Sequence, residues 1–176
     1  MKTNHLLLSS LAGLAAISTV LAVDSTAKTA QRTEVIFSHP EKYADVRDAY
    51  TGSDMGRDGI LAQLESYIVE RSKAYVPEGQ KLLISVTDVD LAGDFEPWRG
   101  GQAMDIRVVK DIYPPKFDLE FKLVGSDLTV LKEGKRKLRD LAFMSKLSIS
   151  QNDMLHYEKA LLDDWLQNEF SRVKAR

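Results

Sequence analysis

The residues best suited to chemistry in this chain are concentrated in residues 86–101, the stretch VTDVDLAGDFEPWRGG. It contains four carboxylates, a tryptophan, an arginine and three glycines. Carboxylates can act as acids and bases or hold a metal ion, whereas tryptophan and arginine are enriched in binding hot spots. The candidate binding residues are Asp88, Asp90, Asp94, Glu96, Trp98 and Arg99, together with Arg107 further along the chain.

The spacing of these acids does not predict a metal site. A calcium loop of the EF-hand type alternates oxygen ligands, has a glycine at its centre and closes with a bidentate glutamate. Here residues 91–93 are Leu-Ala-Gly, and nothing acidic stands at the closing position. No cofactor is predicted either, because the chain contains no serine-nucleophile elbow and no phosphate-cradling glycine loop.

Acid–base catalysis by two of the carboxylates is the main enzymatic alternative. It requires two carboxyl groups about 5–10 Å apart across a cleft, which a sequence cannot show. The remaining histidines of the folded region, His39 and His156, lie in no recognisable catalytic constellation. The pattern therefore favours a binding protein over an enzyme.

Strict alternation along residues 81–91 would place Asp88 and Asp90 on the same face as the hydrophobic residues that precede them. A carboxylate directed at a core face must find a donor, since unpaired burial costs several kcal/mol. We expect Asp88 and Asp90 to form a structural ion pair with Arg99 or Arg107. A β-bulge would instead turn both acids outward.

Trp98 lies on a loop bounded by Pro97 and Gly100. It can fold back as a lid over the end of the sheet, or it can present its ring to a partner. In the second case Arg99 would supply directed hydrogen-bond donors beside the ring.

Hydrophobic periodicity predicts the elements that position this loop. We expect an α+β fold, a two-layer sandwich in which a mostly antiparallel sheet carries two helices on one face. A single domain should span residues 33–173. Strands are predicted over residues 33–37, 81–91, 105–112, 116–124 and 128–131, with a further short strand or bulged extension after Gly134. Helices are predicted over residues 57–75 and over a final segment that begins after the cap region 150–153 and buries Trp165.

The first residues predict export. A weakly basic opening is followed by an uncharged run, residues 6–22, which ends in Val-Leu-Ala. This is typical of a signal peptide, residues 1–22, cleaved before Val23. A membrane anchor is the alternative, although 17 residues are at the lower edge for spanning a bilayer. Residues 23–32 are predicted to be a flexible leader, and the mature protein to be periplasmic or released.

Composition excludes several classes of function. The chain has no cysteine, so it forms no disulfide, thiol nucleophile or cysteine-ligated zinc site. A formal net charge of −2 argues against nucleic acid or an anionic membrane surface as the main partner. We expect an envelope protein or a small ligand as the partner, and no membrane span after signal cleavage.

Three blocks carry a resemblance to a known family: VTDVDLAGDFEPWRGG, DIRVVKDIYPP and YEKALLDDWL. With them the chain resembles a family of secreted, proteobacterial-type periplasmic proteins of unknown function, over roughly residues 33–170. The resemblance implies a location and a domain extent, and it assigns no reaction, cofactor or catalytic residue.

The leading interpretation is a soluble periplasmic binding or accessory protein in which the loop at residues 88–101 forms or braces a recognition surface. One alternative is a small envelope hydrolase that uses Asp88, Asp90 or Glu96 as acid and base. Another is a purely structural partner of an envelope complex.

Overall fold

The computed structural model describes residues 32–47, 54–100, 106–145 and 152–171. The strands and helices in these segments agree with most of the predicted elements. They are β1 (Thr33–Phe37), α1 (Asp54–Ser72), β2 (Lys81–Asp90), β3 (Asp94–Phe95), β4 (Arg107–Val108), β5 (Lys116–Val124), β6 (Val130–Arg139) and α2 (His156–Phe170). Three short 3-10 turns complete them: η1 (Pro40–Lys42), η2 (Pro97–Arg99) and η4 (Phe143–Ser145).

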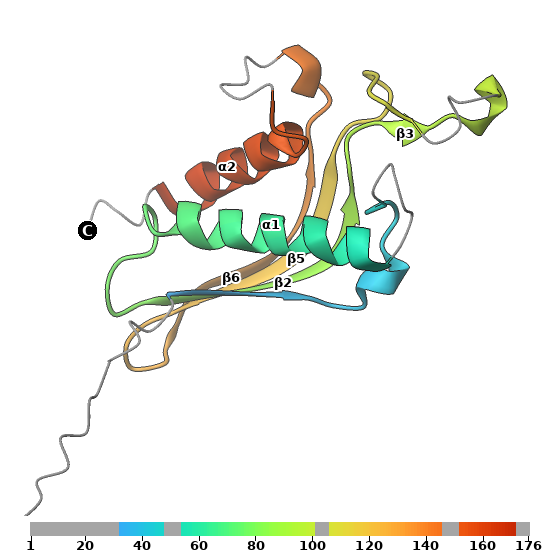
Figure 1. The fold of residues 1–176 in the computed structure, drawn as a ribbon. Helices are drawn as coiled ribbons and strands as arrows, with labels where there is room; N and C mark the ends of the chain where they lie inside the picture. Colours follow the sequence, from blue (N-terminus) through green and yellow to red (C-terminus); the bar gives the residue numbers. More distant parts are fainter. Residues whose placement is uncertain (1–31, 48–53, 101–105, 146–151, 172–176) are drawn as a thin grey trace, which may run out of the picture. The chain divides into compact units, whose positions relative to one another are not determined.

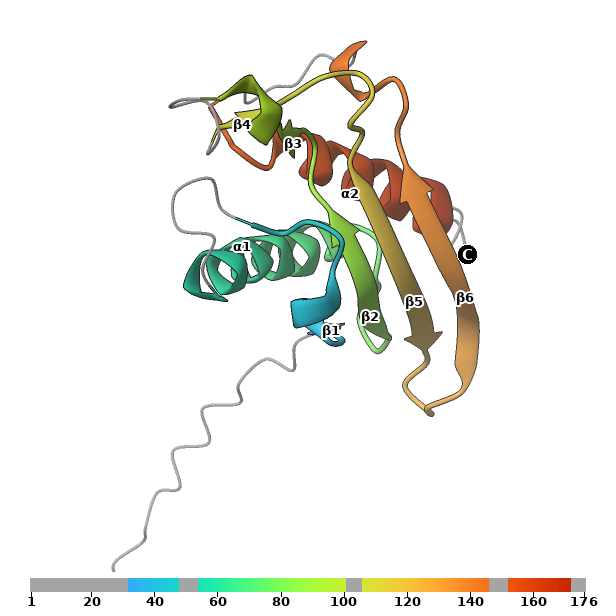
Figure 2. The ribbon, with the colours of Figure 1, turned by 90° about the vertical axis from the view of Figure 1, so that its right-hand side faces the viewer.

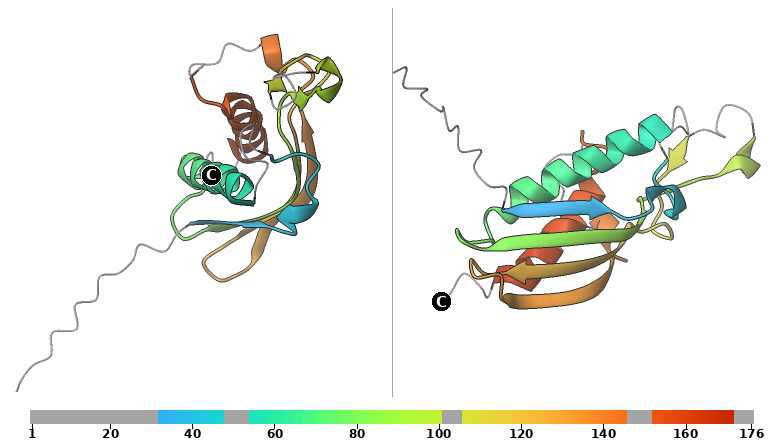
Figure 3. Two further views of the ribbon diagram at one scale, coloured as in Figure 1. Left: turned by 45° about the vertical axis from the view of Figure 1, so that its right-hand side comes forward. Right: turned by 90° about the horizontal axis from the view of Figure 1, so that it is seen from below.

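The main sheet has four strands in the order β1-β2-β5-β6 (Figure 2). β1 pairs with β2 in parallel, with α1 as the connection between them, whereas the other two pairings are antiparallel. Both helices lie on the same side of this sheet (Figures 1 and 3). The predicted α+β sandwich, with a mostly antiparallel sheet and two helices on one face, is therefore confirmed.

The core lies between the sheet and the two helices. β5 alternates as predicted, with Phe117, Leu119, Phe121 and Leu123 at most 3% exposed. Phe121 also meets two aromatic rings of α2 edge to face. Its centroid lies 5.8 Å from that of Trp165 and 5.5 Å from that of Phe170. Such pairs contribute about 0.5–1.5 kcal/mol each beyond their buried area.

Two of the predicted strands differ from the observed ones. β6 runs unbroken through Gly134, where an interruption was predicted, because Gly134 stands opposite Phe121 in the continuous register with β5. A Cβ at Gly134 would lie 3.3 Å from the Phe121 ring and 2.7 Å from the Arg136 guanidinium, so the glycine makes room for both. Within the described residues, the strand predicted at 105–112 is reduced to Arg107–Val108, which pair with the two residues of β3.

The predicted signal peptide, residues 1–22, and the leader up to residue 31 lie outside the described residues. Within the described segments, no helix is both long enough and apolar enough to cross a membrane.

Candidate functional site

The loop singled out in the sequence forms one half of an arm that projects beyond the end of β2 (Figures 1 and 3). We define the arm as residues 94–100 and 106–112. β3 and β4 pair antiparallel within it, with Asp94 opposite Val108 and Phe95 opposite Arg107. Trp98 lies in the turn η2, beyond this pairing.

A β-bulge in β2 decides where Asp88 and Asp90 point. The register with β5 shifts between Val86 and Asp88. Val86 and Val89 are both fully buried, so the core face passes to the odd-numbered positions after the bulge, and Asp88 and Asp90 lie half-buried on the other face. Strict alternation is therefore wrong for these two acids, and the bulge alternative is the one observed, because one extra residue inverts the alternation.

Each of these acids has a partner on a neighbouring segment of the chain. The backbone N–H of Ala44 donates to Asp88 Oδ1 at 2.8 Å, and Lys116 Nζ lies 2.5 Å from Asp90 Oδ2. The hydroxyl of Tyr43 donates to the Val86 carbonyl beside the bulge at 2.8 Å. Its burial, together with the negative charge of Asp88, raises the pKa of Tyr43 to about 12. The bulge is therefore clamped by the segment that follows η1.

Arg107 pairs with an acid that the sequence did not single out. Its Nη2 lies 3.0 Å from Asp45 Oδ2, and it donates to the carbonyls of Gly93 and Arg47 at 3.0 Å each. The expected pairing of Arg107 with Asp88 or Asp90 is therefore wrong. Asp45 is carried to this place by an isolated parallel bridge to Asp90, a non-local contact with no local sequence signal.

Two arginine guanidinium groups lie near the ring of Phe95. The guanidinium carbon of Arg107 is 4.7 Å from the ring centroid, and that of Arg47 is 5.1 Å from it. Asp45 also lies 3.5 Å from Arg47 Nε. Charge and stacking together fasten the base of the arm to the segment that carries Asp45.

Glu96 is turned into the protein instead of towards solvent. It is 1% exposed, and its Oε1 accepts hydrogen bonds from Lys110 Nζ and, at 3.2 Å, from the Tyr113 hydroxyl. These contacts join the outgoing and returning halves of the arm. Glu96 therefore has a structural role, since its carboxylate is occupied by groups of its own chain.

Trp98 is 70% exposed, so it is not a lid over the end of the sheet. Two large hydrophobic residues of the same arm, Ile106 and Ile112, are 56% and 64% exposed. The side chain of Arg99 is not among those described. The arm thus combines a fastened base with an apolar outer part.

Glu158 is a buried acid that the sequence analysis missed. It is 1% exposed, and its Oε1 accepts the N–H of Ala92 at 2.7 Å, just before the arm begins. Its Oε2 has no hydrogen-bond partner among the described residues. Burial raises the pKa of Glu158 against the opposing effect of the Ala92 hydrogen bond. Its helical spacing from buried Leu155 and Leu162 was the signal that could have found it.

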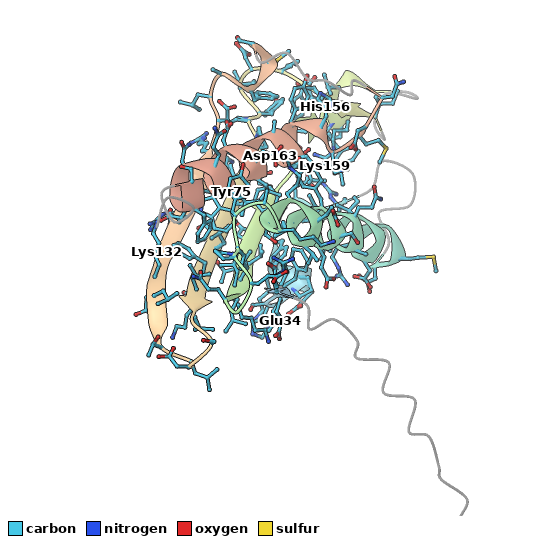
Figure 4. All side chains as sticks on the ribbon, turned by 90° about the vertical axis from the view of Figure 1, so that its left-hand side faces the viewer. Glu34, Tyr75, Lys132, His156, Lys159 and Asp163 are labelled. Atoms are coloured by element: carbon cyan, nitrogen blue, oxygen red, sulfur yellow. The ribbon has the colours of Figure 1, made fainter. Side chains whose placement is uncertain are left out.

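The histidine at the start of α2 takes no part in this arrangement. His156 Nδ1 lies 2.7 Å from the Asp153 carbonyl, and Figure 4 shows it near the N-terminal end of the helix. Among the described residues, no group of three or more His, Asp or Glu side chains is placed to hold a metal ion.

The arm, the bulge, α1 and most of α2 lie within the region matched by one known family. A family profile, DUF3016, described as a protein of unknown function, matches residues 31–168. The chain belongs to DUF3016. A search of curated proteins and a search of solved structures each found no match. Membership of DUF3016 gives the extent of the domain, and any account of its activity depends on the geometry described above.

Proposed function

We propose that this DUF3016 protein is an exported binding or accessory protein, and that the outer part of its arm contacts a protein partner in the envelope. The observation that carries the proposal is the 70% exposure of Trp98 on a segment whose base is held in place. An exposed indole ring contributes little to the fold. At an interface it supplies a large contact area for the loss of only two side-chain torsions.

The fastening of the arm supports a recognition role. Arg107 with Asp45, and Glu96 with Lys110, hold both halves of the arm to each other and to the sheet end. A surface that is ordered before binding loses less conformational entropy when the partner docks. The exposed side chains of Trp98 and Ile106 would then form the apolar centre of the contact.

The same contacts argue against the hydrolase alternative. Asp88 accepts a backbone N–H, Asp90 pairs with Lys116 and Glu96 is buried against Lys110. Each candidate acid therefore has a structural partner of its own, and Glu96 is inaccessible to a substrate.

Export is part of this proposal and has its own test. The uncharged run at residues 6–22 and the Val-Leu-Ala site before Val23 support cleavage. The intact mass of the protein from a periplasmic fraction should correspond to a chain that begins at Val23. A protein that retains Met1 and sediments with membranes would contradict the proposal.

Affinity capture tests the recognition surface. The mature protein is used as bait in envelope extract, as wild type, as Trp98→Ala and as Met55→Ala. Met55 is 84% exposed at the start of α1, so it is a matched apolar control away from the arm. We expect Trp98→Ala to lose the main captured protein and Met55→Ala to retain it.

The captured protein is then identified by mass spectrometry and purified. It should bind wild type at least about tenfold more tightly than Trp98→Ala, the effect of a modest hot spot. Equal affinity of the two baits would overturn the proposed role of the arm.

A further inference from the structure

A polar cleft of about 290 Å³ lies at the base of the arm, separate from Trp98. Gly93 and Asp94 from the start of the arm line it, as does the chain that returns from the arm. The lining also includes the segment that carries Asp45 and Arg47, and the ends of β2 and β5. The charged residues of the lining are Asp45, Arg47, Asp90, Asp94 and Lys116. Its volume is close to the lower limit for small-molecule sites, about 300 Å³.

Charges of both signs line this cleft. Asp45 is already held by Arg107, and Asp90 by Lys116. The carboxylate of Asp94 is different. Its Oδ1 accepts the N–H of Phe95, and it forms no ion pair within the described part of the chain. A half-buried carboxylate with a free oxygen is suited to accept a hydrogen bond from a ligand cation.

Arg47 supplies the opposite charge on the same lining. Its side chain is 63% exposed, its guanidinium carbon lies 5.1 Å from the centroid of the Phe95 ring, and its Nε lies 3.5 Å from Asp45 Oδ1. Because most of this side chain is exposed, its guanidinium can still reach a ligand carboxylate, which it can bind in a bidentate manner. Lys116 is a second cation on the lining, 42% exposed.

We propose that this cleft binds a small zwitterion of the α-amino acid class, with its ammonium group on Asp94 and its carboxylate on Arg47. Because Asp45 and Asp90 are already paired with cations, Asp94 and Arg47 are the two charges of the lining available to a ligand, and a simple anion or a simple cation would pair with only one of them. A ligand that carries both charges can pair with Asp94 and Arg47 at the same time. The side chain of the ligand would then rest against Ile112 and Pro114, at the end of the arm.

Calorimetry with the mature protein tests this site, with the standard L-amino acids as probes. Propionate and ethylamine, which each carry one of the two charges, and glucose, which carries none, are the comparison ligands. We expect at least one amino acid to bind with a Kd below about 1 mM, and the single-charge compounds at least about tenfold more weakly. No binding by any amino acid, or equal binding of propionate, ethylamine or glucose, would overturn the proposal.

Variants assign the binding to the cleft. Asp94→Asn and Arg47→Gln should each weaken it by about tenfold or more, because each removes one charged partner of the ligand. Lys135→Gln removes a 79% exposed cation from the middle of β6, which does not line the cleft, and should leave affinity unchanged. Thermal melts of each variant verify folding. If Arg47→Gln is unstable, Asp94→Asn alone tests whether the amino acid binds in the cleft, because it keeps the shape of the side chain. Unaltered binding by Asp94→Asn would overturn the assignment.

The cleft and the arm tip are tested independently. Trp98→Ala should lose its protein partner and still bind the amino acid, because Trp98 does not line the cleft. If Trp98→Ala loses the amino acid as well, the separation of the two sites is wrong.

Discussion

The guanidinium of Arg107 and the carboxylate of Asp45 lie 3.0 Å apart, with 16% and 10% of their side chains exposed. They join β4 in the arm to a segment 62 residues earlier in the chain. Arg107 also donates to the Gly93 carbonyl at the start of the arm. This pair is therefore one of the contacts that attach the base of the arm to the segment that carries Asp45.

Replacing Arg107 by Gln should lower the free energy of unfolding by about 3 kcal/mol, near the lower end for a buried pair that loses one partner. The cost arises because Asp45 stays nearly buried without its cation. Urea unfolding measures it. Lys73→Gln is the control, since its pair with Glu70 is about half exposed or more on both sides and should contribute no more than about 1 kcal/mol. Equal effects of the two variants would show that the Asp45–Arg107 pair is not buried in solution.

Glu158 and Glu169 should give the stability opposite dependences on pH. Burial raises the pKa of Glu158, so the folded state holds this proton more tightly than the unfolded chain. The free energy of unfolding then falls as the pH rises from the ordinary value of 4.5 through the folded-state pKa. Glu158→Gln removes this loss. The difference in stability, variant minus wild type, should therefore increase from acid to neutral pH.

Glu169 is the matched comparison with the opposite sign. Burial opposes its ionisation, but the hydrogen bonds from Arg136 and Lys132 outweigh burial and lower the pKa of Glu169. The free energy of unfolding of wild type therefore increases as the pH rises through this lowered pKa towards 4.5. Glu169→Gln lacks this increase, because its side chain does not ionise. Urea unfolding of wild type and both variants from acid to neutral pH measures the two slopes. Slopes of the same sign would contradict the assigned environments.

The layers of the fold follow from local patterns in the sequence. β5 alternates so regularly that its bounds, Lys116–Val124, are those predicted, and the stripe of α2 correctly places Trp165 in the core. Side-chain periodicity is a property of neighbouring residues, so it can be read without knowledge of the partner strand.

The arrangement around the arm could not be obtained in the same way. The bulge after Val86 depends on the register with β5, and one extra residue reverses the faces of Asp88 and Asp90. Asp45 is brought to Arg107 by a contact between segments far apart in the chain. The stretch singled out in the sequence does carry the arm, but the sequence analysis paired its acids by proximity in the chain, which does not decide contacts in space.

Gly93 should tolerate no side chain at the base of the arm. Its φ is +85°, and a Cβ there would lie 2.9 Å from the Val108 carbonyl oxygen and 3.1 Å from Arg107 Cγ. We expect Gly93→Ala to cost about 2–3 kcal/mol, from the left-handed backbone and from displacement of β4. Gly100→Ala is the control, because its φ is +67° and its Cβ would meet nothing within 4 Å. It should cost only the conformational term, about 1 kcal/mol, so equal losses in urea unfolding would rule out the close contact.

The two tryptophans should differ both in fluorescence and in their contribution to stability. Trp98 is 70% exposed and Trp165 is 5% exposed. In Trp165→Phe, where Trp98 is the remaining emitter, acrylamide should quench efficiently and emission should lie at long wavelength. Trp98→Phe should leave only the shielded, blue-shifted emission of Trp165.

Replacement by alanine separates the two tryptophans by their contributions to stability. Trp98→Ala should change the free energy of unfolding by at most about 0.5 kcal/mol. Trp165→Ala should lower it by about 3–5 kcal/mol, because it empties a site between Phe121 and Phe170. If Trp98→Ala were as destabilising as Trp165→Ala, the ring would be part of the core in solution, and it could not be the exposed contact on which the proposed recognition surface depends.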